Sequence, residues 1–418
     1  MQKEIRYAAM AMAFALSPLY LHTAQAHDDH RFNADPVVLS FSTVGDSRQR
    51  LIPGKEDPTQ RIFTDANGNP VLPEQDTIWH QSTKAISRIV SEVEHQHSDL
   101  FFFNGDMIMG YGNTNVPADT STVGSITSSD LVRTYKEYAF WRGMMAGMMG
   151  KGTYVVPVPG NHEVQCSTKK TTEGCTPDHD TTKFKGALVA NENAWRTNMG
   201  DLILDNERMT YMFGHAPSFE NVTDDPVNDA ADNRTTDQSK LSYSFDFNGS
   251  HFAVINTDPV GNDATAPVHW LAKDLAAAKD RGIKHMFVFG HKPAFSYDFD
   301  YSGSTHGFDS NPANRDAFWS LIEEYKATYF CGHEHIYHMT QPTKDQGGKA
   351  WQVLVGSGGS PFDAGLDLLG ATPNPATDRD YAWATVHVHA SGAVDIKVYG
   401  FNDQFGPTKV LQSVVLLQ

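Results

Sequence analysis

The sequence of 418 residues has few cysteines, a deficit of positive charge and hardly any long hydrophobic run. Its 33 Lys and Arg residues against 50 Asp and Glu residues give a formal net charge of −17. A chain this acidic repels polyanions, so we expect neither a nucleic-acid polymer nor an anionic membrane surface as a partner. After residue 26, no stretch reaches the roughly 20 apolar residues that a membrane-spanning helix needs.

The one apolar run, at about residues 8–21, lies near the N-terminus. It follows Lys3 and Arg6 and precedes the small-residue sequence AQA at 24–26, which is the arrangement of a secretory signal peptide. A membrane anchor is the alternative, but the run is too short for one. We predict a signal peptide over 1–26 and an exported protein, periplasmic or secreted.

Export gives a role to two of the three cysteines. Cys166 and Cys175 lie at the ends of the polar stretch CSTKKTTEGC, and an oxidising compartment favours a disulfide between them. Cys331 follows the apolar sequence TYF and is interpreted as a small buried thiol rather than a nucleophile.

The rest of the chain alternates between strand-like and helix-like hydrophobic patterns, which is typical of an α/β protein built of layers. Because no internal repeat or linker interrupts the pattern, we predict a single domain over 27–418. Three polar stretches, near 110–128, 199–240 and 296–311, are interpreted as inserted loops. The expected strands are at 37–46, 99–106, 153–163, 241–258 as a hairpin with Asn248-Gly249 at its turn, 284–291 and 328–335. The expected helices are at about 77–97, 129–149, 183–197, 267–281 and 312–327.

Several of these strands end in Gly followed by a residue that can bind a metal ion. The segments are Gly45-Asp46, Gly105-Asp106, Gly160-Asn161-His162, Gly290-His291 and Gly332-His333-Glu334-His335. One such residue alone is more often a turn former, but five strand ends would bring theirs to one crevice. Oxygen and imidazole ligands in this mixture suit Fe, Mn or Zn.

The segment GHEHIYH at 332–338 holds three histidines. His333 and His335 are two residues apart, so an extended backbone would send both side chains to one face. Glu334 would point the other way. His338 breaks this spacing, and we place it outside the ligand set.

The ordered motifs GD, GD, GNHE, GH and GHEH, spread over 45–335, resemble those of the calcineurin-like metallophosphoesterases. The stretches SYSFDFNGSHFAVINTD and HWLAKDLAAAKDRGIKHMFVFGHKP resemble the purple acid phosphatase branch of that superfamily. The resemblance implies a four-layer αββα sandwich and a site for two divalent or trivalent metal ions.

The resemblance also implies a role for each motif residue. Asp106 would bridge the two metals. The second metal would be completed by Asn161, His291 and His333, and the first would be held by Asp46 and His335. His162 would bind no metal and would instead donate a proton to the leaving oxygen or stabilise the phosphoryl group.

The sequence departs from the family pattern at the first metal. Many members have D-x-H in the first motif, where this chain has Asp46-Ser47-Arg48. Purple acid phosphatases supply a tyrosine at the position of Met109, and here the nearest tyrosine is Tyr111. Three readings stay open, in which the first metal takes an extra water, recruits Tyr111 or binds weakly. Arg48 is interpreted as a phosphate-contacting cation, with a structural salt bridge as the alternative.

The implied function is that of an exported binuclear-metal phosphatase acting on phosphate monoesters, with a metal-bound hydroxide as the attacking group. A phosphodiesterase acting on nucleotide or lipid headgroup diesters is the alternative within the same family. A third reading, motivated by the missing first-motif histidine, is a non-catalytic metal or phosphate binder. Tyr297, Tyr301 and His306 are candidates for a substrate rim, against the simpler reading of a solvated loop.

Overall fold

The computed structural model describes residues 35–48, 63–64, 70–71, 79–168, 184–213, 220–224, 230–297, 307–360, 362 and 380–417. Residues 37–418 form one compact unit, and of the preceding unit, 1–36, only Asp35 and Pro36 are described. The predicted signal peptide and Cys175, Tyr301 and His306 therefore lie outside the described residues.

A six-stranded mixed sheet has the order β17-β16-β15-β1-β4-β5. Its strands are β1 (Val37–Val44), β4 (Leu100–Asn104), β5 (Tyr154–Val158), β15 (Asp380–His389), β16 (Val394–Asn402) and β17 (Lys409–Leu417). β1, β4 and β5 run parallel to one another, whereas β15, β16 and β17 are joined to β1 by antiparallel pairing. The carboxyl ends of β1, β4 and β5 therefore meet at one edge of the sheet.

A seven-stranded sheet has the order β13-β14-β12-β11-β10-β9-β8. Its strands are β8 (Glu220–Asp224), β9 (Tyr243–Phe247), β10 (Ser250–Val254), β11 (His285–Phe289), β12 (Thr328–Cys331), β13 (Tyr337–Thr340) and β14 (Gln352–Val355). β10, β11, β12 and β14 are parallel. The predicted hairpin is confirmed, since β9 and β10 pair antiparallel and Asn248 and Gly249 turn with φ of 46° and 75°.

Phenylalanine side chains fill the space between the two sheets. Phe41 of β1 lies edge-on to Phe287 of β11, with ring centroids 4.9 Å apart, and Phe102 of β4 stacks on Phe289 at 3.7 Å. Because side chains alternate along a strand, Phe103 points to the opposite face, where its ring meets Trp141. The inner faces of both sheets thus form one aromatic core that fixes the strand ends relative to one another.

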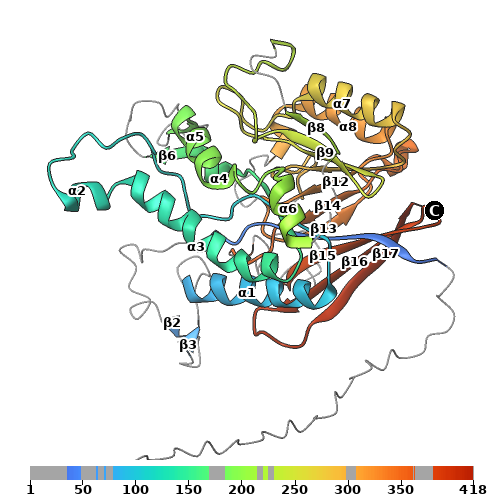
Figure 1. Cartoon of the computed structure of the whole chain (residues 1–418), viewed down its shortest axis with the longest axis horizontal. Helices are drawn as coiled ribbons and strands as arrows, with labels where there is room; N and C mark the ends of the chain where they lie inside the picture. The colour runs from blue at the N-terminus through green and yellow to red at the C-terminus, as the bar shows by residue number, and fades with distance from the viewer. Residues whose placement is uncertain are drawn as a thin grey trace, which may run out of the picture. The chain divides into compact units, whose positions relative to one another are not determined.

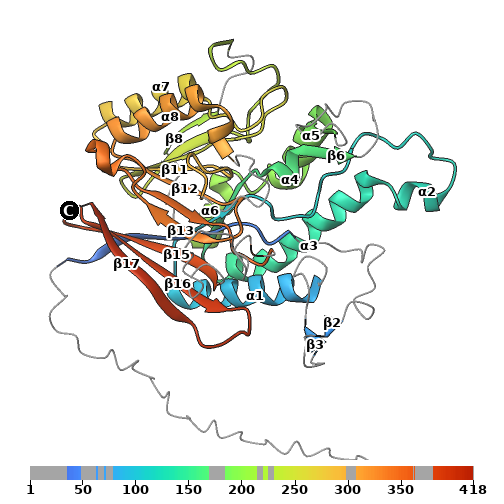
Figure 2. The ribbon, with the colours of Figure 1, turned by 180° about the vertical axis from the view of Figure 1, so that it is seen from behind.

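Helices cover the two outer faces (Figures 1 and 2). α1 (Trp79–Gln96) and α3 (Asp130–Gly150) pack on the six-stranded sheet, and α7 (Val268–Asp280) and α8 (Pro312–Glu324) pack on the seven-stranded sheet. In α1 the buried side chains recur at helical spacing, as in Ile86, Ile89, Val90 and Val93. The predicted αββα sandwich is therefore confirmed.

The remaining elements correct two sequence predictions. The predicted helix at 183–197 begins later, because residues 184–187 pair as a strand with β6 (Gln165–Thr168). The stretch 199–240 is not a plain loop, since it supplies α6 and the edge strand β8, whose polar sequence ENVTD hides its strand character. The elements outside the four layers are α2 (Val123–Thr127), α4 (Asn161–Val164), α5 (Val189–Met199), α6 (Asn206–Phe213), η3 (Ala230–Asp232), η4 (Gly307–Ser310), η5 (Lys344–Gln346), β2 (Phe63–Thr64), β3 (Pro70–Val71), β6 (Gln165–Thr168) and β7 (Phe184–Ala187).

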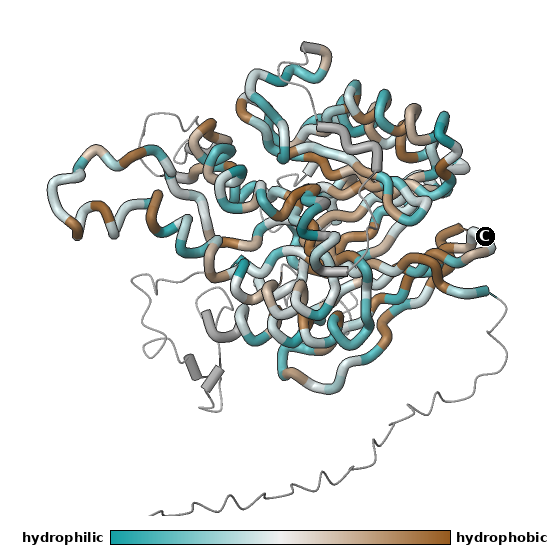
Figure 3. The backbone as a smooth tube through the Cα atoms, in the orientation of Figure 1, coloured by the Kyte–Doolittle hydropathy of each residue, from teal (hydrophilic) through white to brown (hydrophobic). Residues whose placement is uncertain are grey.

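The hydropathy of the chain follows this layering. Hydrophobic colouring is concentrated along the strands in Figure 3, whereas α7 and α8 alternate between hydrophobic and hydrophilic residues. Within the part of the chain that the structure describes, no helix has both the length and the apolar character needed to cross a bilayer.

Candidate metal centre

Five strand ends deliver polar side chains to one place between the two sheets. Asp46 and Asp106 each follow their strand, β1 or β4, by two residues, and Asn161 opens the short helix α4 after β5. From the other sheet, β11 leads to His291 and β12 leads to His333 and His335. The candidate ligand atoms form two sets, and the atoms within each set lie within 4.8 Å of one another. The sets are those of Asp106, His291 and His333 and those of Asp46, Asp106 and His335.

The second ligand group consists of Asp106, Asn161, His291 and His333. The Asn161 Oδ1 atom lies 2.8 Å from His291 Nε2 and 2.9 Å from His333 Nδ1. Asp106 Oδ1 lies 3.1 Å from His291 Nε2. This spacing is that of donor atoms around a single ion at the usual distances of about 2.0–2.2 Å, so the residues fit a metal.

Two members of the second ligand group are held in the orientation that metal binding needs. His291 Nδ1 donates a hydrogen bond to the Asn104 carbonyl oxygen at 2.8 Å, so in the neutral ring that a metal ion requires the lone pair is on Nε2. The Asn161 Nδ2 atom donates to the Tyr111 hydroxyl, so its Oδ1 faces the other ligands. Burial would lower the pKa of His291, but the Asp106 carboxylate raises that pKa to about 9. A strong negative field therefore favours a cation here.

The first ligand group consists of Asp46, Asp106 and His335. Asp46 Oδ2 accepts a hydrogen bond from the His333 backbone N–H at 3.0 Å, and Asp46 Oδ1 lies 3.7 Å from His335 Nε2. Asp46 is fully buried, and among the described residues its Oδ1 has no hydrogen-bond partner. Burial raises the pKa of Asp46 well above its usual value. A buried, unpaired carboxylate oxygen is costly, so this atom also fits a cation.

Asp106 belongs to both groups. Burial would raise the pKa of its carboxyl group, but the nearby His162 and His291 hold that pKa well below the usual value. The carboxylate is therefore charged and central, as the predicted bridging role requires.

Arg48 and His162 lie beside the two ligand groups. The Arg48 guanidinium donates from Nε to Ser360 Oγ at 3.0 Å and from Nη2 to His335 Nδ1 at 3.1 Å, and its Nη1 lies 3.4 Å from His162 Nε2. His162 Nδ1 donates to the Met109 carbonyl oxygen at 2.6 Å, and its Nε2 lies 3.6 Å from Asp106 Oδ2. A guanidinium and an imidazole thus flank the candidate metal positions.

Glu163, to which the sequence reading gave no role, ties the second and third motifs together. Its buried carboxylate accepts hydrogen bonds from the backbone N–H groups of Asp106, Met107, Ile108 and Gly160 at 2.8–3.2 Å. Burial raises its pKa to about 8. The signal was present in the sequence, because an acidic residue directly after two site residues in GNHE needs partners of its own.

The glycines of these motifs are required by close approach. A Cβ atom on Gly105, which has φ of 82°, would lie 2.6 Å from His291 Nδ1. A Cβ atom on Gly160 would lie 2.4 Å from the Asp106 backbone nitrogen. Any side chain at either position would push the ligand segments apart.

The backbone at the ligands is turned rather than extended, which corrects the reading of GHEHIYH. His333 has φ of 73°, and Glu334 N–H donates to the Gly332 carbonyl oxygen at 2.9 Å, so the segment after β12 is a tight turn. His333 and His335 therefore do not share the face of a strand. The turn, rather than strand alternation, directs them to the two ligand groups to which the resemblance assigns them. Asp46, Arg48 and Asp106 also have positive φ, of 63°, 36° and 53°. Such strain is typical of functional sites.

Tyr111 contacts residues of α4. Its hydroxyl contacts the Asn161 amide, and its ring lies 3.8 Å from that of His162. Burial raises its pKa well above the usual value. The structure thus places Tyr111 against the second ligand group, because the left-handed turn at this residue, with φ of 53°, carries the ring across α4.

Tyr297, a candidate for the substrate rim, lies beside Glu334 and His338. Tyr297 N–H donates to Glu334 Oε2 at 2.8 Å, and its ring lies 4.4 Å from that of His338. His338 thus lies outside both ligand groups. Cys166 is disulfide-bonded, and Cys331 is a buried free thiol.

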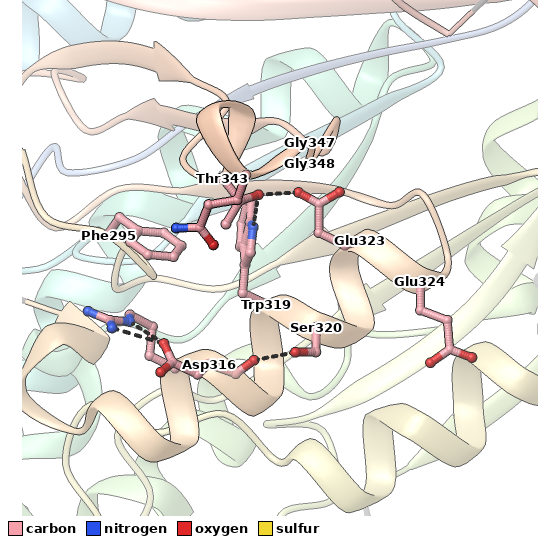
Figure 4. A pocket seen from close by; sticks show the side chains of 11 residues that line it. Phe295, Asp316, Trp319, Ser320, Glu323, Glu324, Thr343, Gly347 and Gly348 are labelled. Carbon is pink, nitrogen blue, oxygen red and sulfur yellow. Dashed lines mark hydrogen bonds and ion pairs between the residues drawn. The ribbon is translucent and has the colours of Figure 1, made fainter.

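A separate pocket of about 740 Å³ lies between α8 and the segment around η5 (Figure 4). Its polar groups bond one another, since Thr343 Oγ1 donates to Glu323 Oε1 at 2.5 Å and Trp319 Nε1 donates to Thr343 Oγ1 at 3.1 Å. None of the predicted site residues lines it. This pocket is therefore separate from the two ligand groups at the strand ends.

Comparison with known proteins identifies the family. A sequence profile of the calcineurin-like phosphoesterases matches residues 79–337, which is more than half of the chain. The chain belongs to the calcineurin-like phosphoesterase family. The matched residues include the whole second ligand group and His335, but begin after Asp46 and Arg48. Dependence on two metal ions is a property of this family, and the two ligand groups correspond to it.

Individual relatives are distant. The chain is similar to purple acid phosphatase 15 of Arabidopsis thaliana, with 22% identity over 315 residues, covering 72% of this chain and 48% of the relative. The chain thus spans about half the length of this curated calcineurin-like relative. Among solved structures it is similar to the purple acid phosphatase PPD1 from yellow lupin seeds (TM-score 0.49, 14% identity, 90% of this chain and 53% of that one). It is also similar to a dimetal phosphatase from Danio rerio (TM-score 0.41, 11% identity, 91% and 99%).

Proposed function

We propose that the protein is an exported, metal-dependent phosphatase that hydrolyses phosphate monoesters. The observation that carries this proposal is the position of Arg48 and His162 beside two ligand groups that share Asp106. A phosphate group at this place would meet fixed positive charge and a proton carrier together. Charge neutralisation and a proton for the leaving oxygen are two of the effects that promote cleavage of a phosphate ester.

The ligand residues would hold two metal ions of the Fe, Mn or Zn class. When bound, such ions withdraw charge from phosphoryl oxygens and lower the pKa of a water molecule toward neutrality, which makes it a nucleophile. Asp106, buried between the groups, keeps the two positions adjacent.

Arg48 supports phosphate binding in this proposal. Its guanidinium is half-buried and is fixed on one edge by Ser360. Guanidinium donors match phosphate oxygens in pairs, so Arg48 would orient the phosphoryl group and offset its charge. The contacts of Arg48 include a hydroxyl and two imidazoles, which place its guanidinium beside both ligand groups.

His162 would serve the leaving group. With Nδ1 engaged by the Met109 carbonyl oxygen, only Nε2 can deliver a proton to the departing oxygen. Nε2 of His162 lies 3.6 Å from Asp106 Oδ2 and 3.4 Å from Arg48 Nη1, between a carboxylate and a guanidinium. Its position outside both ligand groups agrees with a role that is separate from metal binding.

The proposal is tested by comparing the hydrolysis of p-nitrophenyl phosphate with that of bis-p-nitrophenyl phosphate. Full-length protein reconstituted with Mn²⁺, Zn²⁺ or Fe should cleave the monoester at least about tenfold faster, measured as kcat/KM. Faster turnover of the diester would support the phosphodiesterase alternative and overturn the monoester proposal. A protein that binds metal and cleaves neither ester would be the non-catalytic binder.

Export is proposed from the N-terminal pattern and is supported by the disulfide at Cys166, which an oxidising compartment favours. Cell fractionation of the full chain should recover the protein outside the cytoplasm with residues 1–26 removed. A variant that lacks residues 2–26 should stay inside, and recovery of both forms in one compartment would contradict export.

A further inference from the structure

Arg48 contacts the nitrogen of His335 that would need to carry a proton if His335 bound a metal. The guanidinium Nη2 lies 3.1 Å from His335 Nδ1, and arginine has donors only. His335 Nδ1 must therefore present its lone pair to Arg48. In a neutral ring the proton then lies on Nε2, the nitrogen that faces Asp46 at 3.7 Å.

This arrangement opposes a metal in the first ligand group. A ligand nitrogen must offer a lone pair, and the other ring nitrogen must then carry the hydrogen. With Nε2 as the ligand atom, His335 would turn an N–H toward the N–H donors of Arg48. One of the two contacts has to give way.

The unpaired oxygen of Asp46 shows that the first ligand group is weakened rather than lost. Asp46 Oδ1 is buried and has no hydrogen-bond partner among the described residues, so a cation there would still be favoured. The fixed positive charge of Arg48, two residues along the chain, acts against that cation through a partly buried medium. At the first ligand group, the buried Asp46 oxygen thus favours a metal ion and the Arg48 charge opposes it.

We infer that Arg48 makes the two metal positions unequal, so that the second ligand group fills first and the first group fills only when Arg48 leaves His335. This inference rests on the proposed metal-dependent function and adds a control of metal occupancy to the same site. Arg48 acts here as a positioning residue, because it determines which ring nitrogen of His335 carries the proton and does not itself bind the metal.

The expected size follows from the contact that must break. A hydrogen bond to a charged group is worth about ten- to a hundredfold in an equilibrium constant. The two stepwise dissociation constants for Mn²⁺ should therefore differ by at least about tenfold. The readout is isothermal titration of metal-free protein with Mn²⁺, together with the electron paramagnetic resonance spectrum at each stage, which distinguishes isolated ions from coupled pairs.

Two substitutions at Arg48 test its part. Arg48→Met removes the donor and the charge, so the weaker dissociation constant should fall by about tenfold while the stronger one stays unchanged. Arg48→His adds an imidazole near the first group and should bring the two constants close together, with the coupled-pair spectrum appearing at lower Mn²⁺. Arg142→Met is the matched control, since Arg142 pairs with Asp201 on the surface and its loss should change neither constant.

Ser360→Ala provides a milder test that keeps the arginine. It removes the hydroxyl that accepts from Arg48 Nε, so the guanidinium should leave His335 more readily and the weaker site should tighten a fewfold. Equal constants in the wild-type protein would overturn the inference. Unequal constants that neither Arg48 variant changes would also overturn it.

The metal titration separates this inference from the proposed function. Unequal sites governed by Arg48 in a protein that cleaves no phosphate ester would support the inference and refute the function. Two equal sites in an active phosphatase would do the reverse.

Discussion

His291 and His335 are predicted ligands from the same sheet, yet the rings are held in opposite ways. The far nitrogen of His291 donates to the Asn104 carbonyl oxygen, which prepares Nε2 for a metal. The far nitrogen of His335 accepts from Arg48, which places the proton on Nε2. The hydrogen-bond partner of the non-ligating ring nitrogen therefore determines whether the other nitrogen of a histidine can bind a metal.

The two aspartates differ in the same sense. Burial raises the pKa of Asp46, whereas for Asp106 the opposing effect of His162 and His291 prevails over burial and keeps the pKa low. Asp106 therefore supplies a charge that is already stabilised by the protein. At Asp46 the nearby His291 and Arg48 also lower the pKa, but the effect of burial prevails, so its negative charge is less stabilised.

The largest effect is expected from a substitution of Asp106, the residue that the two ligand groups share. Asp106→Asn should lower metal content and activity together, with kcat/KM falling by more than about a thousandfold, because loss of an outer-shell partner alone costs about 10–100-fold. Elemental analysis and p-nitrophenyl phosphate kinetics measure the two quantities. Full activity with full metal content would refute the bridging role.

Single alanine substitutions of His291 and His335 then compare the two ligand groups directly. His291→Ala should weaken the tighter Mn²⁺ equilibrium by more than about a hundredfold, since it removes a ligand that is already oriented. His335→Ala should leave that equilibrium within about threefold of wild type and abolish the weaker one. Titration of each variant with Mn²⁺ measures both. The comparison fails if His335→Ala loses the tighter site instead.

The sequence predicted the architecture well because its signals are local. The buried runs of β1, β4 and β11 read directly as strands, and each ends in Gly followed by a site residue. The strand β8 was missed, because ENVTD is a polar edge strand whose pairing depends on β9 rather than on its own hydrophobicity.

The assembly of the site was predictable only in part. Spacing identified the candidate residues, and the structure brings His291, His333 and Asp106 together. The orientation of His335 could not be read from the sequence, because Arg48 reaches it from a segment 287 residues away along the chain. The turn at His333 was hidden as well, since its positive φ overrides the extended form that alternating residues suggest.

His162 sharpens the comparison by separating chemistry from metal binding. His162→Ala should lower kcat by about a hundredfold, within the range for loss of a proton-transfer group, and leave the tighter Mn²⁺ equilibrium unchanged. The deficit should be smaller for esters whose leaving group needs no proton, such as nitrophenyl rather than alkyl phosphates. A loss of metal in this variant would show that His162 is a ligand after all.

The smallest effect is expected at Tyr111, which supports only the second ligand group. Tyr111→Phe removes the hydroxyl that receives the Asn161 Nδ2–H, so the amide loses the contact that keeps Oδ1 facing His291. The tighter Mn²⁺ equilibrium should weaken by about tenfold, the low end for loss of a residue that orients a ligand, while the weaker one stays as it was. Tyr135→Phe on α3 is the matched control and should change neither. If Tyr111→Phe instead weakened the first group alone, Tyr111 would belong to that metal, and the contrast between the two halves would have to be drawn anew.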